Sequence, residues 1–267
     1  MQKRLDILTV YGLGFVVFLY GPLLLMAVFS FNDSIFAIFP LKGFTFKGYQ
    51  AMANSPALLH ALGNSLKVGI IVSVVSTLFG LLAAMAVTRY RMPGSAPIMG
   101  SIMLPLVIPA IILGIGLLIV LRKVLGIELS LWTVGAGHVL LCIPFSMLTL
   151  VSRLEGFDKS LEEASSDLGE RPLMTFWRVT LPLALPGIVS SLLLAFTVSF
   201  DEIVLAVFLS GTEATLPVYL WGALRFPNQL PGLLALGTTI LVVSTIIVVT
   251  SELVRRRGLQ PGEKEGH

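Results

Sequence analysis

Residues 163–182 read EASSDLGERPLMTFWRVTLP, and they belong to the one sizeable charged segment of a chain that is otherwise strongly apolar. Small and polar residues run up to Gly169, and they predict a short helix that begins near Lys159 and ends at this glycine. Glycine accepts the left-handed backbone conformations that other residues resist. We therefore expect Gly169 to have a positive φ and to turn the chain.

A second short helix is expected directly after this turn. Pro172 suits the first turn of a helix, where its missing N–H has no intrahelical partner to lose. We expect this helix to run to about Val179, and Pro182 and Pro186 to break the chain beyond it. The whole charged segment, 152–186, is thus predicted to be a helix-turn-helix outside the membrane.

Composition places the rest of the chain in a lipid bilayer. Hydrophobic residues make up 55% of the sequence, charged residues only 12%, and the mean hydropathy is +0.92. Soluble domains carry roughly 25% charged residues. Six apolar runs are each near the roughly 20 residues that a membrane-crossing helix needs; they are 7–29, 66–87, 98–121, 131–151, 188–209 and 233–251. They lack the alternation of a barrel strand, so we predict an all-α integral membrane protein with one permease domain over 1–267.

The positive charges set the orientation of these spans. Placing the N-terminus in the cytoplasm puts twelve of the lysines and arginines inside: Lys3, Arg4, Arg89, Arg91, Arg153, Lys159, Arg171, Arg178, Arg255, Arg256, Arg257 and Lys264. Six lie outside: Lys42, Lys47, Lys67, Arg122, Lys123 and Arg225. This bias predicts that both termini, a flexible tail over 258–267 and the charged segment are cytoplasmic. The net charge of +3 thus reflects topology, and no basic patch indicates nucleic-acid binding.

The charged segment resembles the E-A-A-x3-G-x9-I-x-L-P loop of ABC importer permeases. Ser165 replaces the second alanine and Val179 the isoleucine, while the other residues of the pattern are at the expected spacing. In that family the loop receives motion from a separate ATPase. The resemblance implies six coupling residues here: Glu163, Ala164, Ser165, Asp167, Leu168 and Gly169. The alternative is an amphipathic surface helix whose spacing matches by chance.

Two adjacent carboxylates in the fifth span, Asp201 and Glu202, are candidates for the transport pathway. A charged side chain deep in a bilayer costs roughly 2.5 to 3.5 kcal/mol on insertion scales, so the pair needs water or a partner. Adjacent helical residues point about 100° apart, and we expect one carboxylate to face the cavity and the other a neighbouring helix. Phe196 and Phe200 offer aromatic faces that attract cations. The alternative is a structural pairing of these carboxylates with another subunit.

Four further stretches narrow the resemblance to the polyamine branch of importer permeases. They are FSFN at 29–32, SFDE at 199–202, FLSG at 208–211 and TLP at 215–217. The family implies a second, homologous permease, two copies of a cytoplasmic ATPase that uses ATP and Mg, an extracytoplasmic binding protein, and a bacterial inner-membrane location. The stretch PNQLP at 227–231 departs from the best-known spermidine permeases. The solute therefore stays open between polyamines and other small amines, amino-acid-like zwitterions or opines.

Other function classes find little support in the sequence. It contains no Gly-x-x-x-x-Gly-Lys-Ser/Thr phosphate loop, so we expect this chain to bind no ATP and no cofactor. It has no His-Glu-x-x-His or Gly-x-Ser-x-Gly sequence, and its histidines, His60, His138 and His267, are scattered, so we expect no metal and no catalytic residues. A secondary transporter, the remaining rival, normally has an internal repeat of spans and has no use for a charged docking helix.

Several segments carry structural expectations. The aromatic stretch 30–62 predicts a folded cap, part of it a short helix after Pro56. Residues 215–224 are apolar but too short to cross, which favours a re-entrant or interfacial helix. Small residues recur on one face of the second span and predict close helix packing; they are Gly69, Ser73, Ser76, Gly80 and Ala84. His138 is expected to be a hydrogen-bonded structural histidine, and Cys142 a packed apolar side chain.

Overall fold

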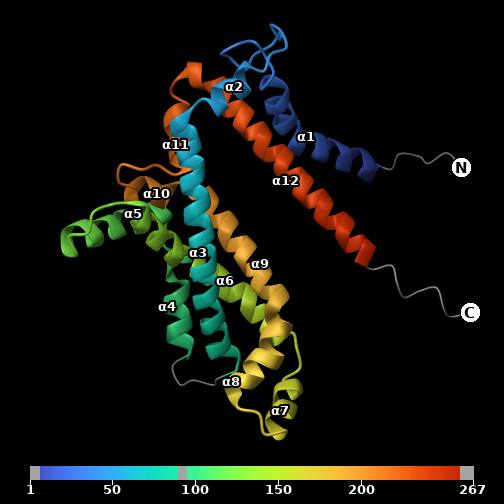
Figure 1. Cartoon of the computed structure of the whole chain (residues 1–267), viewed down its shortest axis with the longest axis vertical. Coiled ribbons are helices and arrows are strands. Elements are labelled where there is room, and N and C mark those ends of the chain that lie inside the picture. The colour runs from blue at the N-terminus through green and yellow to red at the C-terminus, as the bar shows by residue number, and fades with distance from the viewer. Residues whose placement is uncertain (1–6, 90–94, 259–267) are drawn as a thin grey trace, which may run out of the picture. The chain divides into compact units, whose positions relative to one another are not determined.

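The structure, a computed structural model, describes residues 7–89 and 95–258, and they are largely helical (Figure 1). The only β pairing within those residues is a single bridge between Asn32 and Phe44. The all-α prediction is confirmed. The expected tail after Gly258 lies outside the described residues, as do Lys3, Arg4, Arg91 and Lys264.

The internal contacts divide the chain into two compact units, which we describe one at a time. One unit comprises Met1–Leu59 with Leu220–His267, and the other comprises His60–Tyr219. The expectation of a single permease domain over 1–267 stays a prediction.

The first unit contains two long apolar helices, α1 (Ile7–Phe29) and α12 (Leu230–Gly258). The short α2 (Lys47–Ala53) and a 3-10 turn (Pro227–Gln229) accompany them. Both α1 and α2 pack against α12. No residue of α1 is buried, so this helix presents its apolar surface to lipid or to a partner.

The loop before α2 contains the expected aromatic cap. The ring of Phe31 lies 5.1 Å from that of Phe44, 5.6 Å from that of Phe46 and 5.1 Å from that of Tyr49, measured between centroids. The expected short helix after Pro56 is wrong, because Pro56 instead begins the 33-residue α3 (Pro56–Thr88). A proline is favourable in the first turn of a helix, and no breaker stops the helix from continuing into the apolar run.

The second unit is built around α3, α6 (Leu131–Glu155) and α9 (Leu181–Asp201). The small-residue face of α3 packs as predicted, with Ser73, Ser76 and Ala84 buried. Two buried polar contacts join the helices: Thr77 Oγ1 lies 3.0 Å from Ser191 Oγ, and His138 Nδ1 lies 2.9 Å from Ser199 Oγ. His138 is thus the expected structural histidine. Cys142 is buried in the apolar core beside it.

The third expected span is not one straight helix. Residues 98–121 divide into α4 (Ser95–Val107) and α5 (Ala110–Ile119), and the pair is bent by 103°. A π-helical turn, Val120–Val124, extends α5. Pro109 stands at the break with an extended backbone, and its missing N–H and its ring end the helix before it.

The expected breaks at Pro182 and Pro186 are also wrong. The helix that starts at Pro172 passes through α8 (Pro172–Thr175), a π-helical turn (Phe176–Thr180) and α9, and it continues for 30 residues to Asp201. The wider π turn ends at Thr180, two residues before Pro182, and it relieves the clash between the proline ring and the preceding turn. The chain breaks instead after Asp201, and α10 (Val204–Leu209) is a separate helix.

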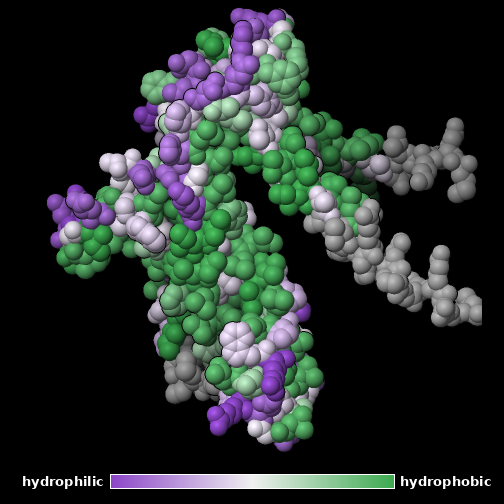
Figure 2. All heavy atoms as spheres, viewed as in Figure 1, coloured by the Kyte–Doolittle hydropathy of each residue, from purple (hydrophilic) through white to green (hydrophobic). Residues whose placement is uncertain are grey.

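Within the described residues, five helices are long and apolar enough to cross a membrane, and the bent pair of α4 and α5 brings this to six if it forms one span. Figure 2 shows hydrophobic residues along the visible sides of the long helices, with hydrophilic residues gathered in several groups, one of them around α7 (Ser160–Asp167) and α8. The expected short helix in 215–224 is present as α11 (Leu216–Ala223). Its position relative to the membrane stays a prediction.

The packing of α3 on α6 predicts opposite effects for two alanine substitutions on α3. A Cβ on Gly80 would lie 2.6 Å from Ser146 Cβ, whereas a Cβ on Gly63 would meet nothing within 4 Å. We expect Gly80→Ala to lower the free energy of unfolding by about 1 to 3 kcal/mol through overpacking. Gly63→Ala, the matched control, should leave it unchanged or raise it by up to about 1 kcal/mol. Thermal unfolding of the chain in detergent measures both, and equal effects would contradict the close contact.

Candidate functional site

The charged segment forms the predicted helix-turn-helix. Lys159 is the N-cap of α7, which ends at Asp167. Gly169 has a φ of +83°, as expected. Its N–H donates to Ser166 O at 2.9 Å, so the turn satisfies a carbonyl at the end of the helix.

Polar contacts hold the two short helices of this segment together. Ser165 Oγ lies 3.0 Å from Thr175 Oγ1, so the serine that replaces the alanine of the family pattern adds a hydrogen bond between α7 and α8. Arg178 forms an ion pair with Glu170 beside the turn. This pair is largely exposed, and pairs of that kind contribute little to stability.

The carboxyl of Asp158, just before α7, accepts a hydrogen bond from the N–H of Ser160 at 3.0 Å. Two hydrogen bonds from Ser160 hold the pKa of this carboxyl below its ordinary value; the backbone N–H has the larger effect and the side chain the smaller one. A carboxylate is therefore present at the N-terminus of α7, where the helix dipole favours negative charge.

Most of the predicted coupling residues are exposed. Glu163, Ala164 and Asp167 are exposed, and Leu168 is 86% exposed. A leucine side chain that is this highly exposed next to a tight turn is suited to insertion into a groove of a partner protein. Ser165, by contrast, is half-buried and faces α8.

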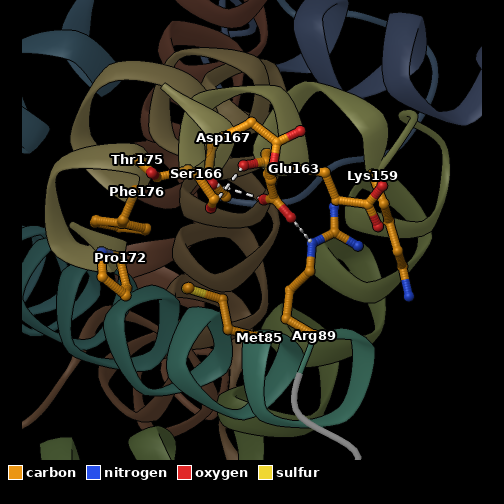
Figure 3. A pocket seen from close by; sticks show the side chains of 11 residues that line it. Met85, Arg89, Lys159, Glu163, Ser166, Asp167, Pro172, Thr175 and Phe176 are labelled. Atoms are coloured by element: carbon orange, nitrogen blue, oxygen red, sulfur yellow. Dashed lines mark hydrogen bonds and ion pairs between the residues drawn. The ribbon is translucent and has the colours of Figure 1, made fainter. Parts of the chain in front are cut away.

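A cavity of about 410 Å³ lies between α7, α8 and the end of α3. Figure 3 shows Met85 and Arg89, from α3 and the residue that follows it, across this cavity from Ser166 and Asp167 of α7. Glu163 and Lys159 also line it. The coupling helix is therefore not packed tightly against the span beside it.

One buried ion pair crosses this cavity, and sequence reasoning missed half of it. Glu162 Oε2 lies 2.7 Å from Arg89 Nε, and Thr180 Oγ1 donates to Glu162 Oε1 at 2.6 Å. The charge bias identifies Arg89 only as a cytoplasmic residue, and the coupling pattern points to Glu163 and not to Glu162. No spacing in the sequence connects the two residues, because the fold alone brings them together.

The two candidate pathway carboxylates have different environments. Asp201 is the last residue of α9 and is exposed. Glu202 lies in the break, where its Oε1 accepts hydrogen bonds from the N–H groups of Val204 at 2.7 Å and Leu205 at 3.1 Å. The expectation that both lie on one continuous helix is therefore wrong. Glu202 leaves the helix and caps α10.

The candidate aromatic residues lie one turn apart near the same end of α9. The rings of Phe196 and Phe200 are stacked with centroids 5.6 Å apart. Phe196 also packs on α3, because a Cβ on Gly69 would lie 3.0 Å from its ring. Phe196, Phe200 and Asp201 thus lie near the same end of α9. The structure places this group and the coupling residues at opposite ends of the helix from Pro172 to Asp201, about 45 Å apart for 30 residues.

Comparison with known proteins agrees with this architecture. Residues 76–258 match the protein family described as the inner membrane component of binding-protein-dependent transport systems. The chain belongs to this family. It is therefore a multi-pass inner-membrane permease subunit.

The permease is similar along most of its length to three proteins named for polyamine transport. It is 36% identical to the spermidine/putrescine transport system permease protein PotC of Escherichia coli strain K12, over 90% of each chain. It is 34% identical to PotC of Haemophilus influenzae, over 91% of this chain and 95% of that one. It is 36% identical to the putrescine transport system permease protein PotI of Escherichia coli strain K12, over 86% and 83%.

Two solved structures share the fold at lower identity. A chain of a bacterial ABC transporter involved in the import of the acidic polysaccharide alginate has a TM-score of 0.72 and 18% identity, over 94% of the permease and 98% of that chain. A chain of the MetNI methionine ABC transporter in an inward-facing conformation has a TM-score of 0.59 and 20% identity, over 75% and 95%. At these identities the likeness concerns the fold alone.

The capping role of Glu202 can be separated from its charge. Glu202→Ala removes the acceptor of both amide hydrogen bonds, and we expect it to lower the free energy of unfolding by about 0.5 to 2 kcal/mol. Glu202→Gln keeps a side-chain carbonyl in the same place and should lose less. Thermal unfolding in detergent tests this order. If the glutamine variant were as unstable as the alanine variant, the cap would not be the relevant contact.

Proposed function

We propose that this permease forms one half of an inward pathway for polyamines such as spermidine and putrescine, or for related small amines. The observation that carries the proposal is the continuous helix from Pro172 to Asp201, which joins the coupling turn at one end to an exposed carboxylate at the other. The names of the three relatives support the polyamine class.

The proposed complex contains a second, homologous permease, two copies of a cytoplasmic ATPase and an extracytoplasmic binding protein that delivers the solute. ATP and Mg would be used by the ATPase, and this chain would take no part in the chemistry. Both termini and the α7–α8 segment would lie in the cytoplasm, in keeping with the excess of lysine and arginine on that side. The exposed side chain of Leu168 supports docking of the segment on another subunit.

Substrate recognition is assigned to Asp201 with the stacked rings of Phe196 and Phe200. A polyamine is a flexible cation, and a carboxylate next to aromatic faces offers it charge and cation–π attraction. Glu202 is a weaker candidate, because one of its oxygens already accepts two amide hydrogen bonds. In the proposed pathway Asp201 binds the cation, and Glu202 stabilises the backbone at the break between α9 and α10.

Coupling would follow from the stiffness of the long helix. Closure of the ATPase on ATP would move α7, and the turn at Gly169 would pass this movement to α8 and α9. Because α8, the π turn and α9 are continuous, a shift at Pro172 displaces the end that carries Asp201. This is a population shift between inward-open and outward-open states, and hydrolysis would reverse it.

The substrate assignment predicts different results for the two carboxylates. In vesicles containing the whole complex and its binding protein, Asp201→Asn should lower uptake of labelled spermidine at least tenfold while assembly and basal ATPase activity persist. Glu202→Gln, of the same size and charge change, should lower it much less. Unchanged uptake in Asp201→Asn would remove this residue from the pathway. Loss of assembly would support a structural pairing instead, and wild-type vesicles that took up no polyamine would exclude that solute class.

The coupling assignment predicts that bulk and reversed charge on α7 are harmful. Gly169→Val forces a branched side chain into a positive-φ position, Ala164→Trp fills an exposed contact surface, and Glu163→Lys reverses a charge there. Each should leave the permease pair formed and reduce ATPase docking or uptake per ATP at least tenfold. Gly169→Asn is the matched control, since asparagine tolerates this conformation. Wild-type uptake and ATPase activity in all three variants would contradict a coupling role.

A further inference from the structure

In the part of the protein that the structure describes, the α7 helix buries no hydrophobic side chain. None of its eight residues is buried, and the cavity of about 410 Å³ separates part of it from α3 and α8. Apolar packing therefore does not determine where α7 lies relative to the membrane-spanning helices. Its position depends on a few directional polar contacts.

We infer that the Arg89–Glu162 ion pair is the joint through which movement of α7 reaches the ends of three membrane-spanning helices. The inference rests on the proposed coupling function and assigns two positioning residues to it. Neither residue belongs to the exposed surface that we propose for ATPase docking. Their side chains are only 9% and 18% exposed, respectively.

Glu162 uses both carboxylate oxygens in this joint. Oε2 pairs with Arg89 Nε at 2.7 Å, and Oε1 accepts the hydroxyl of Thr180 at 2.6 Å. Thr180 is buried and is the last residue of the π turn, directly before α9 begins. A displacement of Glu162 therefore acts on the end of α3 and on the start of α9 together.

Arg89 extends the joint to a third helix. Its Nη2 donates to the carbonyl of Leu154 at 3.0 Å, near the end of α6, and its guanidinium lies 4.6 Å above the centroid of the Phe157 ring. A planar guanidinium can make these contacts in fixed directions at the same time, which a lysine ammonium cannot reproduce. The residue thus holds α7, α3 and α6 in one register.

A second tie lies on the exposed side of the same corner. Lys159 Nζ donates to the carbonyl of Thr88 at 3.1 Å, and Thr88 is the last residue of α3. This contact joins the N-terminus of α7 to α3 close to the buried pair. Both ties are at this corner, and the Ser165–Thr175 hydrogen bond joins the other part of α7 to α8, so α7 can pivot about the joint together with α8.

A buried ion pair of this kind fixes the relative position of the helices that it joins more than it stabilises the fold. Two desolvated charges gain little net stability over apolar groups of the same volume, whereas removal of one partner leaves a costly unpaired charge. Single substitutions would therefore confuse loss of the joint with loss of folding. A double apolar variant removes both charges and keeps the volume filled.

The test compares Arg89→Met/Glu162→Met with wild type in the complete transport complex, together with Arg89→Lys. We expect the double variant to assemble and to unfold at a temperature near that of wild type. Its uptake of spermidine per ATP hydrolysed should fall at least tenfold. Hydrogen exchange of the α7 amides should become at least tenfold faster, because α7 loses its tie.

Arg89→Lys should give an intermediate loss of coupling. Glu170→Gln, which breaks an exposed ion pair in the same segment, is the matched control and should change each readout less than twofold.

Three results would overturn the inference: wild-type coupling in the double variant, failure of the double variant to assemble, or an equal loss in Glu170→Gln. The second would mean that the pair serves folding alone. Hydrogen exchange of α7 needs no substrate, so it tests the joint even if wild type transports no polyamine. If wild type transported no polyamine, the proposed solute would be refuted, and the hydrogen-exchange rates alone would decide whether the ion pair is the joint.

Discussion

The second unit depends on how helices associate where lipid is the solvent. Apolar side chains gain nothing by leaving lipid tails for one another, so association requires close approach of small residues and a few hydrogen bonds. Both are present between α3, α6 and α9. Gly80 lets α3 reach the backbone of α6, while the Thr77–Ser191 and His138–Ser199 contacts supply buried hydrogen bonds. These contacts fix the helices whose ends carry the functional residues.

The same constraint favours charged side chains at the ends and breaks of the helices. Backbone groups must be satisfied wherever the chain leaves a helix within an apolar surrounding. Glu202 meets that need at the break after α9 by accepting two amide hydrogen bonds, which leaves Asp201 as the free carboxylate. At the opposite end, Glu162 forms an ion pair with Arg89 and accepts the hydroxyl of Thr180, and Arg89 donates to the carbonyl of Leu154. The carboxylates with structural partners are thus distinct from Asp201, which we propose as the substrate-binding carboxylate.

The coupling segment combines a rigid connection with a loosely packed helix. In the proposed mechanism the continuous helix from Pro172 to Asp201 would transmit displacement, because no break interrupts it. The α7 helix, with no buried residue, can shift against its cavity without disturbing a core. An element that must move is expected to have few apolar contacts, since each contact would have to be broken in every cycle.

The sequence alone was enough to predict a lipid environment, an all-α fold and the turn at Gly169. Hydropathy, the length of the apolar runs and a glycine at a helix end act locally, so they can be recognised without the fold. The sequence also located Asp201 and the small face of α3. It did not show that the helix continues through Pro182 and Pro186, because the effect of a proline depends on the geometry of the turn before it. Glu202 accepts hydrogen bonds from two amides close by in the chain, but only the structure shows the break after Asp201 that exposes them. Only the tertiary structure decided that Glu162 pairs with Arg89, because the fold brings these two distant segments together.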